Sequence, residues 1–168
     1  MSDVYHFRQR KDDFLKNDPS SPVAGSSFEA LRYYPVTESF VVRAQLKPFD
    51  LQDEVKLPTN TGEPEAYRRF ARAEFRINET SQALTLYLPL GGDGARAFVP
   101  FADKTNGAET YAGGRYLEVN LNKGGPLRLD FNYAYNPFCA YSERYRCPLP
   151  PEENRLNMFI RAGEKAFE

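Results

Sequence analysis

The chain has 168 residues, of which 41% are hydrophobic and 27% are charged. This composition is typical of a folded chain and excludes a disordered one, and the length fits a single domain. The 22 Lys and Arg residues nearly balance the 23 Asp and Glu residues, which leaves a net charge of −1. We therefore expect no overall attraction to nucleic acid or to an anionic membrane surface.

The first residues predict a helix. In residues 1–18, hydrophobic side chains recur at helical spacing, and Pro19 ends the helix because the residue before a proline avoids the α region. Lys11 interrupts the hydrophobic stripe, so we expect the helix to lie on the surface of the core. The single histidine, His6, belongs to this helix and has no partner nearby in sequence for a metal or catalytic role.

Most of the remaining chain consists of short segments whose polarity alternates, which is typical of half-buried strands. Residues 70–78 and 83–88 predict a β-hairpin, and residues 115–121 and 127–131 predict a second one around the turn at 122–125. The segments that we expect to be strands are residues 28–34, 39–47, 70–78, 83–88, 96–101, 115–121, 127–131 and 156–162.

These segments predict a mainly β fold, an antiparallel barrel or sandwich of about eight short strands with an N-terminal helix. We expect residues 48–67 to be a surface loop. Residues 156–162 fit a strand or a short helix, and Gly163 directly after them favours the strand. The single domain 1–168 then divides into a helix at 1–18, a β core at 28–131, an irregular clasp rich in proline and tyrosine at 132–155, and a closing strand and tail at 156–168.

Two patterns suggest nucleic-acid or phosphate binding, and we interpret both as structural. Arginines alternate with aromatic residues between Tyr67 and Arg76, as they do in platforms for single-stranded nucleic acid. Glu74 partly neutralises this face and the chain lacks excess positive charge, so we expect a solvated strand face and no nucleic-acid partner. The glycines of residues 91–94 are not followed by the Lys-Ser/Thr of a phosphate loop.

The sequence contains no segment that approaches the roughly 20 apolar residues of a membrane span, and its charged start is unlike a secretory signal. We therefore expect a cytoplasmic protein with no membrane partner. One histidine and two cysteines do not supply the four ligands of a structural zinc site, so we expect no metal and no cofactor.

Cys139 and Cys147 are eight positions apart and are flanked by Pro137 and Pro148. Their separation suits either a disulfide that closes a small loop or two buried thiols near one another. The choice depends on the redox compartment, so both alternatives stay open.

Two blocks of sequence resemble a known family. The first consists of Phe101-Ala102-Asp103, Thr105, Gly107, Glu109-Thr110-Tyr111 and Gly114-Arg115-Tyr116. The second consists of Asp130-Phe131-Asn132, Ala134-Tyr135-Asn136-Pro137, Cys139-Ala140-Tyr141, Cys147-Pro148-Leu149-Pro150-Pro151 and Asn154. They resemble the bacterial and archaeal family catalogued as domain of unknown function 1684, strongly over residues 98–165. The resemblance implies a compact, β-rich domain and brings no activity.

The same two blocks hold the polar side chains that are candidates for a ligand site. The candidates are Asp103, Thr105, Thr110, Tyr111, Arg115, Asp130, Asn132, Tyr135 and Asn136. If they converge at one end of the barrel, they line a pocket in which Arg115 faces an anionic group. In the structural alternative, Asp103 and Asp130 cap their own turns and Arg115 pairs with one of them.

We therefore expect a domain that binds a small polar or anionic ligand. One alternative is a hydrolase or isomerase that uses Asp103 or Asp130 as a general base, so whether the protein is an enzyme stays open. Another is a protein-interaction module on the segment rich in proline and tyrosine, which requires a large exposed aromatic patch.

Overall fold

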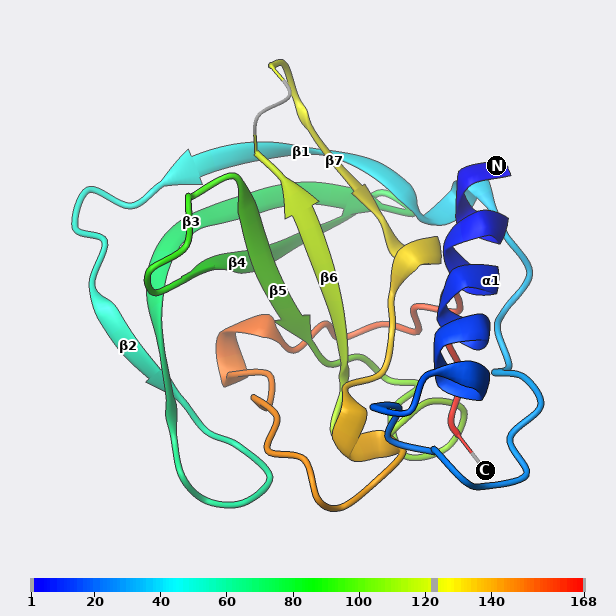
Figure 1. The fold of residues 1–168 in the computed structure, drawn as a ribbon. Coiled ribbons are helices and arrows are strands. Elements are labelled where there is room, and N and C mark those ends of the chain that lie inside the picture. Colours follow the sequence, from blue (N-terminus) through cyan, green and yellow to red (C-terminus); the bar gives the residue numbers. More distant parts are fainter. Residues whose placement is uncertain (1, 122–123, 168) are drawn as a thin grey trace.

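The computed structural model describes residues 2–121 and 124–167 (Figure 1). Within these residues the chain has one α-helix, α1 (Ser2–Asn17), and one antiparallel sheet of seven strands. The strands are β1 (Val41–Pro48), β2 (Glu54–Leu57), β3 (Glu65–Ile77), β4 (Thr80–Pro89), β5 (Arg96–Phe101), β6 (Arg115–Asn120) and β7 (Leu127–Asp130). The short 3₁₀ helices are η1 (Glu38–Phe40), η2 (Phe131–Tyr133), η3 (Phe138–Ala140) and η4 (Glu152–Asn154).

The sheet curls into a nearly closed barrel. Its strand order is β6-β5-β4-β3-β1-β7, with β2 paired to the first part of β3. Figure 1 shows α1 beside the barrel, next to the end of β7, where Phe7 packs edge-on against Tyr133 of η2. The predicted fold class, a mainly β antiparallel architecture with an N-terminal helix, is confirmed. No helix in the described part of the chain is both long enough and apolar enough to cross a membrane.

The barrel interior follows the alternation of the sequence. In β3 the alternate residues Ala71, Ala73, Phe75 and Ile77 are all buried, and the last three belong to one hydrophobic cluster. The first predicted hairpin is confirmed, since β4 returns along β3 after a turn in which Asn78 and Glu79 have positive φ angles of 50° and 64°. Two consecutive positive φ angles match the right-handed twist of the strands that they join.

The second predicted hairpin is wrong within the described residues, because β6 pairs with β5 and β7 pairs with β1. Of its expected turn at 122–125, residues 122–123 lie outside the described residues. Because β7 pairs with β1, β6 and β7 form the two opposite edges of the sheet. The added strand brings the barrel close to closure. The expected surface loop at 48–67 is also corrected, since it contains β2 and the start of β3.

Residues 28–34 and 156–162 form no strand, and β2 was not expected, so the described residues contain seven strands where the sequence predicted eight. We call residues 156–167 the C-terminal segment. Residues 28–34 lie between α1 and this segment: the Asp12 carboxylate accepts from the Leu31 amide, and the Tyr34 amide donates to the Gly163 carbonyl. The amide of Ile160 donates to the Asp103 carboxylate, 2.7 Å away, instead of to a neighbouring strand. Both segments therefore lack a continuous strand partner for a ladder.

Residues 132–155 and the C-terminal segment cover the end of the barrel where β5 ends and β6 begins (Figure 1). Pro148 bridges to Thr59, and Leu149 donates to Pro58 on the β2–β3 loop. Gly163 has a φ of 80°, and a Cβ there would lie 2.7 Å from the Ala134 carbonyl oxygen. Glycine at this position lets the C-terminal segment lie directly on the chain that follows η2.

Candidate functional site

Four candidate residues of the first block, Asp103, Thr105, Thr110 and Arg115, form a buried hydrogen-bonded cluster. The Asp103 carboxylate accepts from the Thr105 amide at 3.3 Å, from the Thr105 hydroxyl at 2.9 Å and from the Ile160 amide at 2.7 Å. The hydroxyls of Thr105 and Thr110 lie 2.8 Å apart. Asp103 therefore caps its own turn and holds the C-terminal segment against it.

Arg115 is fully buried on the inward side of β6, at the end of the barrel. Its terminal nitrogens donate to the carbonyl oxygens of Ile160 at 2.8 Å, of Glu164 at 3.2 Å and of Ala162, and one lies 3.4 Å from the Asp103 carboxylate. Burial lowers the pKa of the Arg115 guanidinium, and the charge of Asp103 opposes that shift. These four contacts use the four N–H bonds of the terminal nitrogens, so Arg115 binds the C-terminal segment.

The candidates of the second block tie the end of β7 to other parts of the chain. Asp130 accepts from the Asn132 amide at 3.0 Å and thereby caps η2. The Asn132 side chain exchanges two hydrogen bonds with the backbone of Thr37, at 3.0 and 2.8 Å. Asn136 donates to the Glu164 carboxylate and to the Lys165 carbonyl. Both blocks therefore meet the C-terminal segment, each through its own contacts.

Glu164 is a buried carboxylate that sequence reasoning missed. It accepts from Lys11 at 2.6 Å, from the Asn136 amide at 3.0 Å and from the Tyr141 hydroxyl. Burial lowers the pKa of Lys11 and raises that of Tyr141. The one signal in the sequence was Lys11 itself, which interrupts the hydrophobic stripe of α1 because it points inward at this carboxylate.

A pocket of about 390 Å³ lies where residues 135–148 cross the outward faces of β5 and β6. We call it the aromatic pocket. Its lining includes the six aromatic residues Tyr67, Phe98, Tyr116, Tyr135, Phe138 and Tyr145, together with Glu118, Asn136 and Arg146. Thus two of the nine predicted polar residues, Tyr135 and Asn136, line this pocket.

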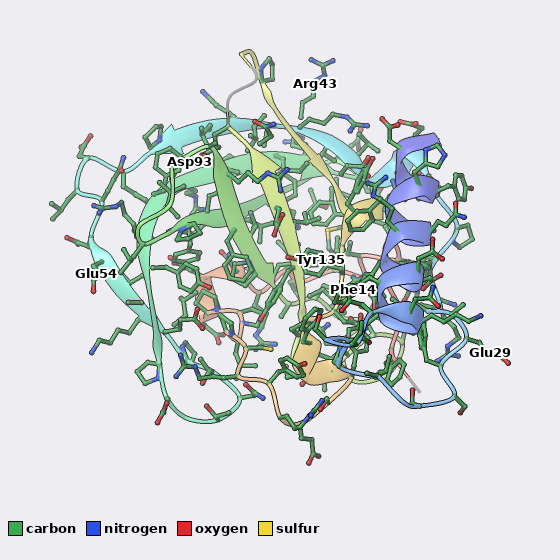
Figure 2. All side chains as sticks on the ribbon, viewed as in Figure 1. Phe14, Glu29, Arg43, Glu54, Asp93 and Tyr135 are labelled. Carbon is green, nitrogen blue, oxygen red and sulfur yellow. The ribbon has the colours of Figure 1, made fainter. Side chains whose placement is uncertain are left out.

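The rings of the aromatic pocket meet mainly at steep angles. Phe98 and Tyr116 are 4.6 Å apart at 77°, and Tyr116 and Tyr135 are 5.7 Å apart at 87°. Tyr67 stacks on Phe98 at 5.3 Å. Figure 2 shows Tyr135 between β6 and α1, where its ring also receives the Lys11 ammonium at 4.9 Å from its centre. The side chains of Glu118 and Arg146 are 51% and 46% exposed.

Cys139 and Cys147 are both buried and both free. The Cys139 amide donates to the Cys147 sulfur at 3.3 Å, and the Tyr111 hydroxyl lies 3.5 Å from the Cys139 sulfur. Tyr111, a third predicted candidate, lines a second pocket of about 510 Å³ with Cys139. Among the residues that the structure describes, no group of three or more His, Cys, Asp or Glu side chains is arranged to hold a metal ion.

The fold and these contacts define a mainly β, barrel-like domain whose polar motif residues brace its covered end. The chain belongs to the family described as "Protein of unknown function (DUF1684)", whose model matches residues 26–165, and the predicted family resemblance is confirmed. The solution NMR structure of an uncharacterized protein of Haloarcula marismortui is similar, with a TM-score of 0.77 and 34% sequence identity. That similarity covers 98% of this chain and 92% of the other. The comparison with curated proteins found no match.

Proposed function

We propose that the protein binds a small molecule with a planar aromatic ring in the aromatic pocket. The observation that carries this proposal is the gathering of six Tyr and Phe side chains around one concavity on the outer face of the barrel. Small-molecule sites are mostly apolar hollows with a few polar groups that orient the ligand. Aromatic faces and edges bind a planar ring in offset-stacked and edge-on arrangements, and the pocket offers both.

Glu118 and Arg146 supply the polar contacts at this pocket. Arg96 lies 3.4 Å from Glu118, and Glu63 lies 2.9 Å from Arg146. Exposed ion pairs of this kind contribute only about 0–1 kcal/mol, so a ligand with polar substituents displaces them at little cost. Arg146 takes the role that the sequence had suggested for Arg115, whose terminal N–H bonds are already occupied.

The two alternative functions have weaker support. Asp103 and Asp130 each cap a turn, and a carboxylate held by its own backbone amides is poorly placed to act as a general base. An interaction module would present a contiguous aromatic patch. The exposed large hydrophobic side chains of the described residues are distributed over separate segments: Tyr5, Leu51, Leu90, Phe138 and Phe159.

The test is a thermal-shift and NMR screen with planar aromatic fragments, each paired with its saturated-ring analogue. Aromatic fragments should raise the melting temperature of the wild type, because a ligand that binds only the folded state stabilises it, and the saturated analogues should not. Tyr145→Ala removes one wall of the pocket and should weaken binding by about tenfold, the equivalent of about 1.4 kcal/mol.

Tyr5→Ala is the matched control, because Tyr5 is a 57% exposed tyrosine on α1. It should bind fragments as the wild type does. Binding of aromatic and saturated rings with equal affinity, or equal responses from Tyr145→Ala and wild type, would contradict the proposal. Circular dichroism of each variant checks that its fold is intact.

A further inference from the structure

The two cysteines form a prearranged pair of thiols. The Cys139 amide donates to the Cys147 sulfur at 3.3 Å, so the side chain of Cys147 lies against the backbone of Cys139. The backbone at Cys147 is held in place by Asn60, whose side chain accepts from the Cys147 amide at 2.8 Å and whose amide donates to the Cys147 carbonyl. The two cysteines are therefore held close together without a covalent bond between them, as a pair that forms a disulfide requires.

Each thiol also borders a pocket on the surface. Cys139 lines the pocket of about 510 Å³ together with Tyr111, Asn60 and Ser142. Cys147 lines the aromatic pocket on its other side. The two residues are 8% and 7% exposed, so a small oxidant such as hydrogen peroxide can approach them from these pockets. A structural thiol in a sealed core has no such opening.

The groups around the pair favour a thiolate on Cys139. The neighbouring Cys147 side chain and the Tyr111 hydroxyl, 3.5 Å away, lower the pKa of Cys139, although burial opposes them. The neighbouring Cys139 side chain and burial raise the pKa of Cys147. The other titratable side chains whose charges act on the pair are Glu65, Tyr67 and Tyr116. A thiol that has a hydroxyl donor on one side and a second cysteine on the other is the arrangement of an oxidisable cysteine with a resolving partner.

We propose that Cys139 and Cys147 are a site of reversible oxidation by hydroperoxides, with Cys139 as the attacking thiol and Cys147 as the resolving thiol. The Cys139 thiolate attacks one peroxide oxygen; an S–O bond forms, the O–O bond breaks, and the leaving oxygen takes a proton from solvent. The sulfur loses two electrons, which reduce the peroxide to water or an alcohol. Cys147 then loses its proton and attacks the sulfenic sulfur; the S–S bond forms and hydroxide leaves with that proton as water.

This modification does not depend on whether the aromatic pocket has a ligand, and its readouts are separate from fragment binding. The wild-type protein is treated with hydrogen peroxide, the peroxide is removed, and intact mass and a non-reducing peptide map are recorded. We expect a loss of two hydrogen atoms, about 2 Da, located in a Cys139–Cys147 crosslink and reversed by dithiothreitol. No crosslink under conditions that oxidise a model thiol, or crosslinks between separate chains alone, would overturn the proposal.

Two single variants assign the roles. Cys147→Ser should retain a sulfenic acid on Cys139 that dimedone traps, whereas Cys139→Ser should give no comparable adduct on Cys147. The reverse result, or equal trapping in both variants, would overturn the assignment. Tyr111→Phe keeps the ring and removes the hydroxyl donor, so it should slow oxidation several-fold at neutral pH while the same crosslink still forms. An unchanged rate in a folded Tyr111→Phe protein would count against the thiolate.

Discussion

At the scale of single residues, Arg115 most clearly shows how a side chain suited to ligand binding is used for folding. It is fully buried, pairs with Asp103, and holds the backbone carbonyls of residues 160–164 in place. Removing one partner of a buried ion pair leaves the other charge uncompensated and typically costs about 3–5 kcal/mol. We therefore expect Arg115→Ala to lower the free energy of unfolding by about 3–5 kcal/mol, measured by urea denaturation.

The matched control for this substitution is Arg155→Ala. The Arg155 side chain is 59% exposed and lies 3.8 Å from Glu152, so its loss should change the free energy of unfolding by no more than about 0.5 kcal/mol. Equal stability of the two variants would show that Arg115 is not the brace that its contacts describe. Hydrogen exchange in residues 156–164 should rise in Arg115→Ala in particular.

At the scale of elements, Asn154 of η4 acts as a backbone substitute between β4 and β5. Its side chain accepts from the Thr85 amide at 2.7 Å and donates to the carbonyls of Thr85 and Pro100, both at 2.8 Å. Pro100 has no N–H, so β5 has no donor to offer β4 at this point. The side-chain amide of Asn154 bridges the two strands where they do not pair directly.

We expect Asn154→Ala to lower the free energy of unfolding by about 2–4 kcal/mol, because it leaves the buried Thr85 and Pro100 groups without these partners. Urea denaturation monitored by far-UV circular dichroism measures the change. Glu152→Ala, a change at a 91% exposed side chain of the same 3₁₀ helix, is the control and should be nearly neutral. A loss of less than about 1 kcal/mol in Asn154→Ala would contradict the bridging role.

At the scale of the whole molecule, tyrosines that are buried or half-buried make the stability fall at alkaline pH. Burial is the main cause that raises the pKa of nine of them, with Tyr34 raised to about 12: Tyr33, Tyr34, Tyr67, Tyr87, Tyr111, Tyr116, Tyr133, Tyr135 and Tyr141. Above a pH of about 10 the unfolded chain loses these protons while the folded protein keeps them. The folded state then binds more protons, so the free energy of unfolding must fall as pH rises.

We therefore expect the melting temperature to fall progressively above a pH of about 10, where the unfolded chain loses its tyrosine protons. Burial lowers the pKa of Lys11, so this group makes the free energy of unfolding rise with pH. Its effect is smaller than the combined effect of the nine tyrosines. Thermal melts between about pH 8 and 11, together with tyrosinate absorbance, measure both changes. Tyrosines that ionise near pH 10 in a protein that stays folded would contradict the expectation.

Much of the fold could be predicted from the local alternation of polar and hydrophobic residues. Residues 96–101 were predicted as a strand with the same ends as β5, and the first hairpin follows from alternation on either side of a turn. In residues 156–162 the alternate side chains Leu156, Ile160 and Ala162 are buried, as a strand pattern implies. The prediction of a strand in residues 156–162 was wrong, because backbone groups of this segment bind the side chains of Asp103 and Arg115 instead of a neighbouring strand.

The sequence by itself determined which side chains face inward, because alternation is a property of neighbouring residues. It also pointed to the two charged side chains that bind Glu164 of the C-terminal segment. Lys11 interrupted the hydrophobic stripe of the first helix, and Arg115 was predicted as a candidate site residue. Only the tertiary structure decided that β7 pairs with β1, that Glu164 receives Lys11, and that Arg115 binds the C-terminal segment. These contacts join residues far apart in the chain, and a charged side chain takes whichever partner the closed barrel brings within reach.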